Sequence, residues 1–321
     1  MLINKKYYIL YNFLTKKYYN DYYKEKKMKY ALIDIGSNSI RLNVYNKDNI
    51  QKEVFSKKYM AGLAGLVEDG KLSDKGIKKL MKVLSAQKML LDYLPIDEIY
   101  VFASASLRNV DNGKEIVKKI KKELDLNIDL ISADDEAFYG AEGMKMAYDF
   151  DDYYTIDIGG GSTELCYLKN KEIKDMAFLK TGSLSLFRDY VENTIPSVRE
   201  YDEMINAIDK MLAENVSTYK CTKLVASGGT ARALGNIFEE LDNDDDKEYT
   251  IDDIKDYIYE MIDRNKKNIR TTVMVVPERL HSIVPGAIML YRLLKHLGIE
   301  KVNVSKLGVR EGYLKDKIIK E

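Results

Sequence analysis

The sequence has few of the residues on which disulfide-rich, zinc-binding and membrane-spanning proteins depend. Its 321 residues include two cysteines, two histidines, four prolines and no tryptophan. Cys166 and Cys221 lie far apart and belong to no CxxC or Cys/His cluster, which argues against a disulfide framework or a zinc site and favours a reducing cytosol. No apolar run reaches the roughly 18 residues of a membrane span. We therefore expect a cytoplasmic globular protein of about two domains.

An excess of charge of one sign is also lacking. The 51 Lys and Arg residues balance 51 Asp and Glu residues. Bulk charge therefore favours neither nucleic acid nor an acidic membrane, and a polyanionic ligand would need a local positive field. Residues 1–27 differ, because they are rich in Lys and Tyr without a signal-peptide pattern. We expect a weakly structured extension ahead of Met28; contact of this tail with a membrane or nucleic acid is the alternative.

The most informative motif is the stretch 154–168, which reads YTIDIGGGSTELCYL. Glycines let backbone N–H groups approach a phosphate, and hydroxyls donate hydrogen bonds to its oxygens. Carboxylates hold a hard cation such as Mg²⁺. The predicted phosphate contacts are Gly159, Gly160, Gly161, Ser162 and Thr163. The predicted metal ligands are Asp157 and Glu164, and a tight hairpin without a ligand is the alternative.

An earlier stretch, 31–45, repeats this pattern as ALIDIGSNSIRLNVY. Asp34 aligns with Asp157 and is therefore a third candidate metal ligand. The aligned loop supplies further phosphate contacts: Gly36, Ser37, Asn38 and Ser39. Both loops lead into another strand rather than into a helix, which argues against P-loop and Rossmann folds. Two such loops facing each other across a cleft would grip a polyphosphate from both sides.

Hydrophobic periodicity predicts the same order of elements twice. The expected strands are 29–35, 40–45, 50–56, 99–103, 128–131, hairpin strands within 154–179, 223–226 and 302–304. The expected helices are 73–94, 114–124, 132–148, 183–191, 198–216, one after 230, 251–267, 284–297 and 310–319, with a loop at 239–246. Strand triplets followed by helices describe two α/β domains. We place them at 28–152 and 153–309, with a C-terminal helix of about 310–321 packing back on the first domain.

Further candidate residues lie outside the two loops. Gly228, Gly229 and Thr230 follow a strand and open a helix, where an anion is favoured, although a plain strand-to-helix turn explains the same residues. Arg108 and Arg279 suit bidentate phosphate recognition, with surface arginines as the alternative.

Two other residues have a functional and a structural interpretation. Glu136 ends an acidic triplet after Ser132, and it either supports the helix N-terminus or orients a water for attack on phosphorus. His281 has no sequence partner, so a structural role is favoured over a catalytic one, and the sequence leaves its role open.

From Met28 onward the chain resembles the exopolyphosphatase / guanosine pentaphosphate phosphohydrolase (Ppx/GppA) family of the actin-like ATPase superfamily. The matching blocks are IDIGSNSIRL (33–42), ASASLRNVDNG (103–113), ISADDEA (131–137), IDIGGGSTEL (156–165) and SGGTARAL (227–234). RLHSIVPGAIML (279–290) and VSKLGVREGYL (304–314) match more loosely.

The resemblance implies two actin-like, ribonuclease H-like domains with a cleft between them. It implies Mg²⁺-dependent hydrolysis of terminal phosphoanhydride bonds in inorganic polyphosphate or guanosine pentaphosphate. It assigns Glu136 as the catalytic base and Glu164 as a second catalytic carboxylate, with Arg108 and Arg279 as positive residues of the cleft. A homodimer without nucleic acid or membrane partners is the expected assembly.

The chain also departs from the family pattern. The usual Gly-Glu-Glu-Glu is Ala133-Asp134-Asp135-Glu136 here, and Arg-Leu-His at 279–281 loses a carboxylate. These departures leave the preferred substrate and chain length open. The alternatives are a nucleotide-binding regulator that binds guanosine tetraphosphate without hydrolysis, and a kinase or ATPase of the same superfamily.

Overall fold

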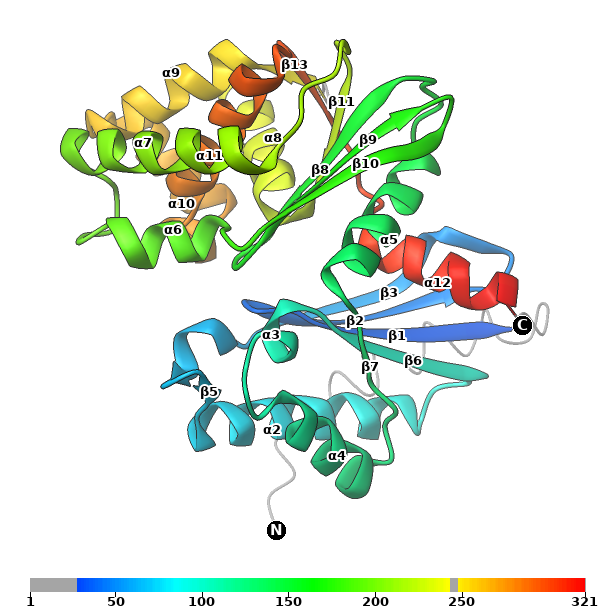
Figure 1. The fold of residues 1–321 in the computed structure, drawn as a ribbon. Coiled ribbons are helices and arrows are strands. Elements are labelled where there is room, and N and C mark those ends of the chain that lie inside the picture. The colour runs from blue at the N-terminus through cyan, green and yellow to red at the C-terminus, as the bar shows by residue number, and fades with distance from the viewer. Residues whose placement is uncertain (1–27, 243–247, 321) are drawn as a thin grey trace.

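The computed structural model describes residues 28–242 and 248–320, so the predicted extension at 1–27 lies outside the described residues. The described strands form two large sheets, one in each half of the molecule (Figure 1). The first sheet has the order β3-β2-β1-β6-β7, with β1 (Lys29–Ile35), β2 (Ser39–Asn46), β3 (Asn49–Met60), β6 (Glu98–Ala103) and β7 (Asp129–Leu130). A small separate sheet pairs β4 (Val67–Glu68) with β5 (Lys71–Leu72).

The second sheet repeats the topology of the first. Its order is β10-β9-β8-β11-β13-β12, with β8 (Tyr153–Ile158), β9 (Thr163–Lys169), β10 (Glu172–Leu179), β11 (Leu224–Ser227), β12 (Glu248–Thr250) and β13 (Lys301–Val304). In each sheet the first strands are antiparallel, and β6 or β11 then adds parallel to β1 or β8. Asp34 pairs with Arg41 where Asp157 pairs with Glu164. The predicted duplication of an α/β unit is confirmed.

Helices cover the outer face of each sheet, because their apolar stripes match the buried strand residues. On the first sheet these are α2 (Asp74–Leu91) and α4 (Gly113–Leu124). The short η1 (Leu63–Leu66) precedes α2, and the short α3 (Ala105–Arg108) precedes α4. The second half carries α6 (Ser183–Tyr190), α7 (Val198–Asn215), α8 (Gly228–Asp242), α9 (Ile251–Ile262), α10 (Lys266–Val275), η2 (Pro277–Arg279) and α11 (Ile283–Leu297).

Two further helices, α5 (Ala133–Lys145) and α12 (Val309–Lys320), lie between the sheets (Figure 1). Tyr139 of α5 and Tyr313 of α12 pack with the first sheet, with ring centroids 5.4 Å apart. Ala137 and Ala141 of α5 pack with the second sheet instead. Because a Cβ at Gly312 would lie 1.9 Å from the Tyr139 carbonyl oxygen, the two helices cross in backbone contact. The first turn of α5 is thereby fixed at the junction of the halves.

The sequence-based prediction of elements was wrong in two places. The helix expected at 251–267 is two helices, because Arg264 has φ 61° and its guanidinium donates to the carbonyl oxygens of Ile195 and Pro196 at 3.0 and 3.2 Å. The acidic run expected to be a loop starts inside α8, which continues to Asp242; residues 243–247 lie outside the described range. Ser73 stands at the N-cap of α2 without a capping hydrogen bond from its side chain.

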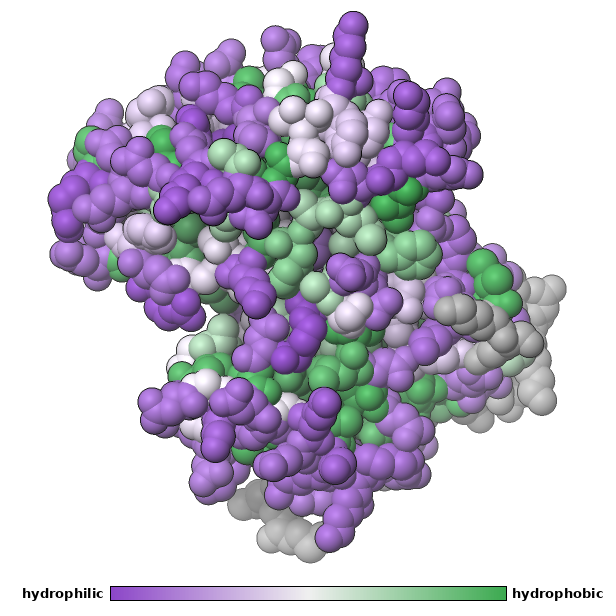
Figure 2. Space-filling view, in the orientation of Figure 1, coloured by the Kyte–Doolittle hydropathy of each residue, from purple (hydrophilic) through white to green (hydrophobic). Residues whose placement is uncertain are grey.

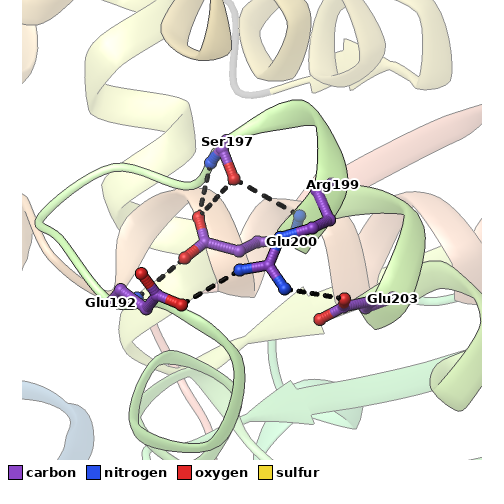
Figure 3. Close-up of polar contacts among 5 residues, drawn as sticks. All are labelled: Glu192, Ser197, Arg199, Glu200 and Glu203. Atoms are coloured by element: carbon purple, nitrogen blue, oxygen red, sulfur yellow. Dashed lines mark hydrogen bonds and ion pairs between the residues drawn. The ribbon is translucent and has the colours of Figure 1, made fainter.

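The N-terminus of α7 is held by a polar cluster (Figure 3). Ser197 and Glu200 form a capping box, in which the Ser197 N–H donates to Glu200 Oε2 at 2.6 Å. Glu200 Oε1 accepts from the Glu192 N–H at 2.8 Å, so this carboxylate also ties down the preceding loop. Arg199 bridges Glu192 and Glu203 on the surface side. The cluster fixes the start of a helix that packs on the second sheet.

The surface agrees with the composition. Figure 2 shows mostly hydrophilic residues on one face, with hydrophobic residues gathered where the two halves meet. Across the described part of the chain, no helix is both long and apolar enough to pass through a bilayer. Cys166 and Cys221 are both free thiols.

Candidate active site

A pocket of about 390 Å³ lies between the two halves. Its walls come from the β1–β2, β8–β9 and β11–α8 turns, from η2, and from the first turns of α5 and α12. The structure brings most of the predicted site residues to these walls: Asp34, Gly36, Ser37, Asn38, Ser39, Glu136, Asp157, Gly159, Gly160, Gly161, Ser162, Glu164, Gly228, Gly229 and Arg279.

The two glycine loops have the same turn and face each other. The Gly36 N–H donates to the Ser39 carbonyl oxygen at 3.1 Å, and the Gly159 N–H donates to that of Ser162 at 3.0 Å. A Cβ built on Gly161 would lie 3.6 Å from Ser37 Oγ. The loops therefore meet across the pocket, as the repeated motif predicted.

The turn between β11 and α8 depends on two glycines. Gly228 has φ +83°, and a Cβ there would lie 2.0 Å from Asp157 Oδ1. A Cβ on Gly229 would lie 1.9 Å from Arg279 Nη2, so the guanidinium rests directly on the backbone of this turn. Ser227 Oγ donates to Asp157 Oδ2 at 2.9 Å. Glycine thus lets a carboxylate and a guanidinium reach the same turn.

Two carboxylates and one arginine form a largely buried part of the site. Arg108 Nη1 donates to Glu136 Oε2 at 2.9 Å, and the side chains are only 16% and 12% exposed. Burial raises the pKa of Glu136, and Arg108 opposes that rise. Burial, and then the Glu136 and Asp157 charges, raise the pKa of Glu164 well above its usual range. Glu164 Oε1 is buried and has no partner among the described residues.

Basic side chains occupy other walls of the pocket: Arg41, Lys58, Arg232, Arg279 and Arg310. Burial, followed by the charge of Arg310, lowers the pKa of Arg232 to about 10. Arg310 Nη1 donates to Asn43 Oδ1 at 3.0 Å, and its Nε lies 3.9 Å from Asp34 Oδ2. Of these cations, sequence reasoning had selected Arg279 alone. Arg41, Arg232 and Arg310 lie within the sequence blocks that match the family, so they could have been selected from the sequence. Lys58 lies in none of these blocks.

Four predicted or considered residues do not line the pocket. Arg108 donates to Glu136 and so positions that carboxylate, while its phosphate contact stays a prediction. Thr163 Oγ1 donates to the Thr181 carbonyl oxygen at 2.8 Å. Thr230 is buried against Gly286, where a Cβ on the glycine would lie 2.7 Å from Thr230 Cγ2. Phosphate contacts by these two threonines stay predictions. The His281 ring packs edge-on against Phe187, with centroids 5.0 Å apart.

Comparison with known proteins agrees with this geometry. The family model described as the Ppx/GppA phosphatase family matches residues 44–321. The chain belongs to this family. The fold is accordingly the two-domain actin-like fold of Ppx/GppA proteins. The sequence-based family assignment is confirmed.

Named relatives and solved structures show how far the likeness extends. The chain is 28% identical to a bifunctional 3-dehydroquinate synthase/phosphatase of Fusobacterium nucleatum and 25% identical to a guanosine-5'-triphosphate,3'-diphosphate pyrophosphatase of Aeromonas hydrophila. Each match includes 89% of this chain but 46% and 58% of the relative, so the chain spans about half their length.

Two solved structures match over nearly their whole length. The Ppx/GppA family member of Aquifex aeolicus has a TM-score of 0.76 at 25% identity, over 91% of this chain and 98% of that one. An exopolyphosphatase of Cytophaga hutchinsonii has a TM-score of 0.79 at 18% identity, with the same coverage, and supports the fold alone.

The acidic residues of this Ppx/GppA pocket fit a divalent cation by charge. Burial raises the pKa values of Asp34 and Asp157 despite nearby arginines, and Glu164 keeps an unpartnered oxygen. A cation would relieve the repulsion between these carboxylates. Among the described residues, no group of three or more His, Cys, Asp or Glu side chains is arranged so that it could hold a metal ion. Water and phosphate oxygens would therefore complete the coordination, as is common for Mg²⁺.

Proposed function

We propose that this chain is an exopolyphosphatase-like phosphohydrolase, which removes the terminal phosphate of inorganic polyphosphate and also accepts guanosine pentaphosphate. The observation that carries the proposal is the Arg108–Glu136 pair beside Glu164, at the buried part of a pocket lined by glycine turns and basic side chains. Such a pocket offers donors for phosphate oxygens and carboxylates for water.

In the proposed reaction, the oxygen of a water attacks the terminal phosphorus in line with the bridging oxygen. The bond from phosphorus to the bridging oxygen breaks, and its electron pair stays on the shortened chain. Glu136 accepts the proton of the attacking water, and Arg108 holds that carboxylate in place. The glycine turns hold non-bridging oxygens of the transferred group, and Arg279 holds a phosphate further along the chain. Asp34, Asp157 and Glu164 would hold Mg²⁺ directly or through water, and the cation would supply charge neutralisation for the phosphates.

The deciding experiment compares phosphate release from long polyphosphate, tripolyphosphate, guanosine pentaphosphate and ATP, each with Mg²⁺ and with a chelator. We expect Mg²⁺-dependent release from long polyphosphate, with ATP the poorest substrate. Binding of guanosine tetraphosphate without turnover of any substrate would instead indicate the regulator. Release that depends on an added acceptor would indicate a kinase.

Glu136→Gln should lower kcat by about 10²- to 10⁴-fold, which is the usual contribution of a positioned general base. Asp134→Asn is the matched control, because Asp134 is an exposed acid in the same first turn of α5. The control should retain full activity. Comparable activity of the Glu136 variant and the wild type would contradict the assigned role.

A further inference from the structure

One ion pair joins the two halves of the molecule at the pocket. Lys58 lies on β3 of the first sheet, and Glu278 lies on η2 of the second half. Lys58 Nζ is 3.1 Å from Glu278 Oε1, and both residues line the pocket. Their side chains are 26% and 37% exposed, compared with 16% and 12% for Arg108 and Glu136. The Lys58–Glu278 pair therefore stands at the outer part of the pocket.

The carboxylate of this pair lies among cations. The charges of Arg279 and Arg41 act on Lys58, in addition to its partner Glu278. Arg279 follows Glu278 directly in the chain, and its guanidinium contacts the backbone of the β11–α8 turn at Gly229. Glu278 stays ionised, since hydrogen bonding and the Lys58 and Arg279 charges outweigh its burial and lower its pKa. In a site for polyanions, an ionised carboxylate held by cations occupies the position that a phosphate would take.

We propose that Lys58 and Arg279 form an outer phosphate subsite and that Glu278 fills it until a chain long enough to reach it displaces the carboxylate. The inference rests on the proposed function and names its substrate class: linear polyphosphates that extend from the buried carboxylates to the outer part of the pocket. A short anion binds near Glu136 and Glu164 without disturbing the pair. A long chain opens the Lys58–Glu278 contact and replaces it with phosphate contacts to both halves.

The test uses Glu278→Gln, which keeps the shape of the side chain and removes its charge. We expect KM for long polyphosphate to fall about fivefold with kcat changed less than twofold, because partly exposed ion pairs contribute modest energies. Inhibition by orthophosphate should change less than twofold. Lys58→Met should raise KM for the long chain about fivefold, again without affecting orthophosphate.

The matched control is Glu248→Gln, which removes an exposed ion pair with Lys301, and neither of these residues lines the pocket. It should leave KM and kcat unchanged. The Lys58→Met/Glu278→Gln double variant should bind long polyphosphate more weakly than Glu278→Gln alone. An unchanged or higher KM for long polyphosphate in Glu278→Gln would overturn the proposal, as would an equal gain for orthophosphate.

Calorimetry in the Glu136→Gln background separates this inference from the proposed function, because it measures binding without turnover. Long polyphosphate should bind about fivefold tighter when Glu278→Gln is added. If the wild type hydrolyses nothing but this difference persists, the outer subsite stands and the proposed reaction fails. If the wild type hydrolyses polyphosphate but the difference is absent, the reaction stands and the outer subsite is wrong.

Discussion

At the residue scale, Arg108 connects the elements that carry the two candidate catalytic carboxylates. Its Nη1 donates to Glu136 Oε2 and also to the Ile131 carbonyl oxygen at 3.1 Å. The guanidinium carbon lies 5.3 Å from the centre of the Phe178 ring, and Phe178 pairs in register with Glu164 on β9. The aromatic face therefore helps to hold Arg108 against Glu136 from the opposite half of the molecule.

We predict that Phe178→Leu lowers kcat roughly fivefold while KM changes less than twofold, since a cation–π contact of this kind is worth about 1 kcal/mol. Phe178→Tyr keeps the aromatic face and should restore most of kcat. Steady-state kinetics with polyphosphate measure both. Met176→Ala, an exposed change on the same strand, is the control. Equal losses in the Leu and Tyr variants would show that Phe178 acts through packing alone.

At the scale of elements, the capping box of α7 gives a prediction that depends on pH. Burial disfavours the ionised form of Glu200, but hydrogen bonds from Glu192 and Ser197 outweigh it and lower its pKa below the ordinary 4.5. Its contribution to stability is therefore present above pH 4.5 and is lost as the pH falls through the lower folded value. Glu200→Gln should cost about 1 kcal/mol of unfolding free energy at pH 7 and much less at pH 3.

Urea unfolding at the two pH values checks this, with Glu203→Gln as the control. Glu203 makes one exposed ion pair with Arg199 and should matter by less than about 0.5 kcal/mol at either pH. An equal loss at pH 3 and pH 7 for Glu200→Gln would exclude ionisation as the cause.

Elements with strong local signals could be predicted, and those that depend on tertiary contacts could not. Apolar periodicity and the repeated Ile-Asp-Ile-Gly motif identified β1, β2, β8 and β9. The break between α9 and α10 was missed because Arg264 ends the helix through carbonyl groups far away in sequence. For the same reason the motifs located Glu164 and Asp157 but not Lys58, which reaches the pocket only because β3 extends to Met60.

At the scale of the whole molecule, the position of Glu136 depends on the crossing of α5 and α12. The helix α5 begins with Glu136 in its first turn, packs on both sheets, and touches α12 through backbone atoms. The helix α12 in turn places Arg310 in the pocket, where it lies near Asp34. A change in the distance between these helices therefore moves site residues from both halves together.

Gly312→Ala tests this dependence. The added Cβ would lie 1.9 Å from the Tyr139 carbonyl oxygen, so the helices must separate, which we expect to cost about 1–3 kcal/mol of unfolding free energy and to lower kcat. Gly235→Ala in α8 is the matched control, because its Cβ would meet side chains no closer than 3.6 Å. That change should be neutral or stabilise by up to about 1 kcal/mol with unaltered kcat. Thermal unfolding and phosphate release, measured on both variants, test whether the helix crossing sets the geometry of the site. If the Gly312→Ala protein is as stable and as active as the Gly235→Ala protein, the crossing does not set that geometry.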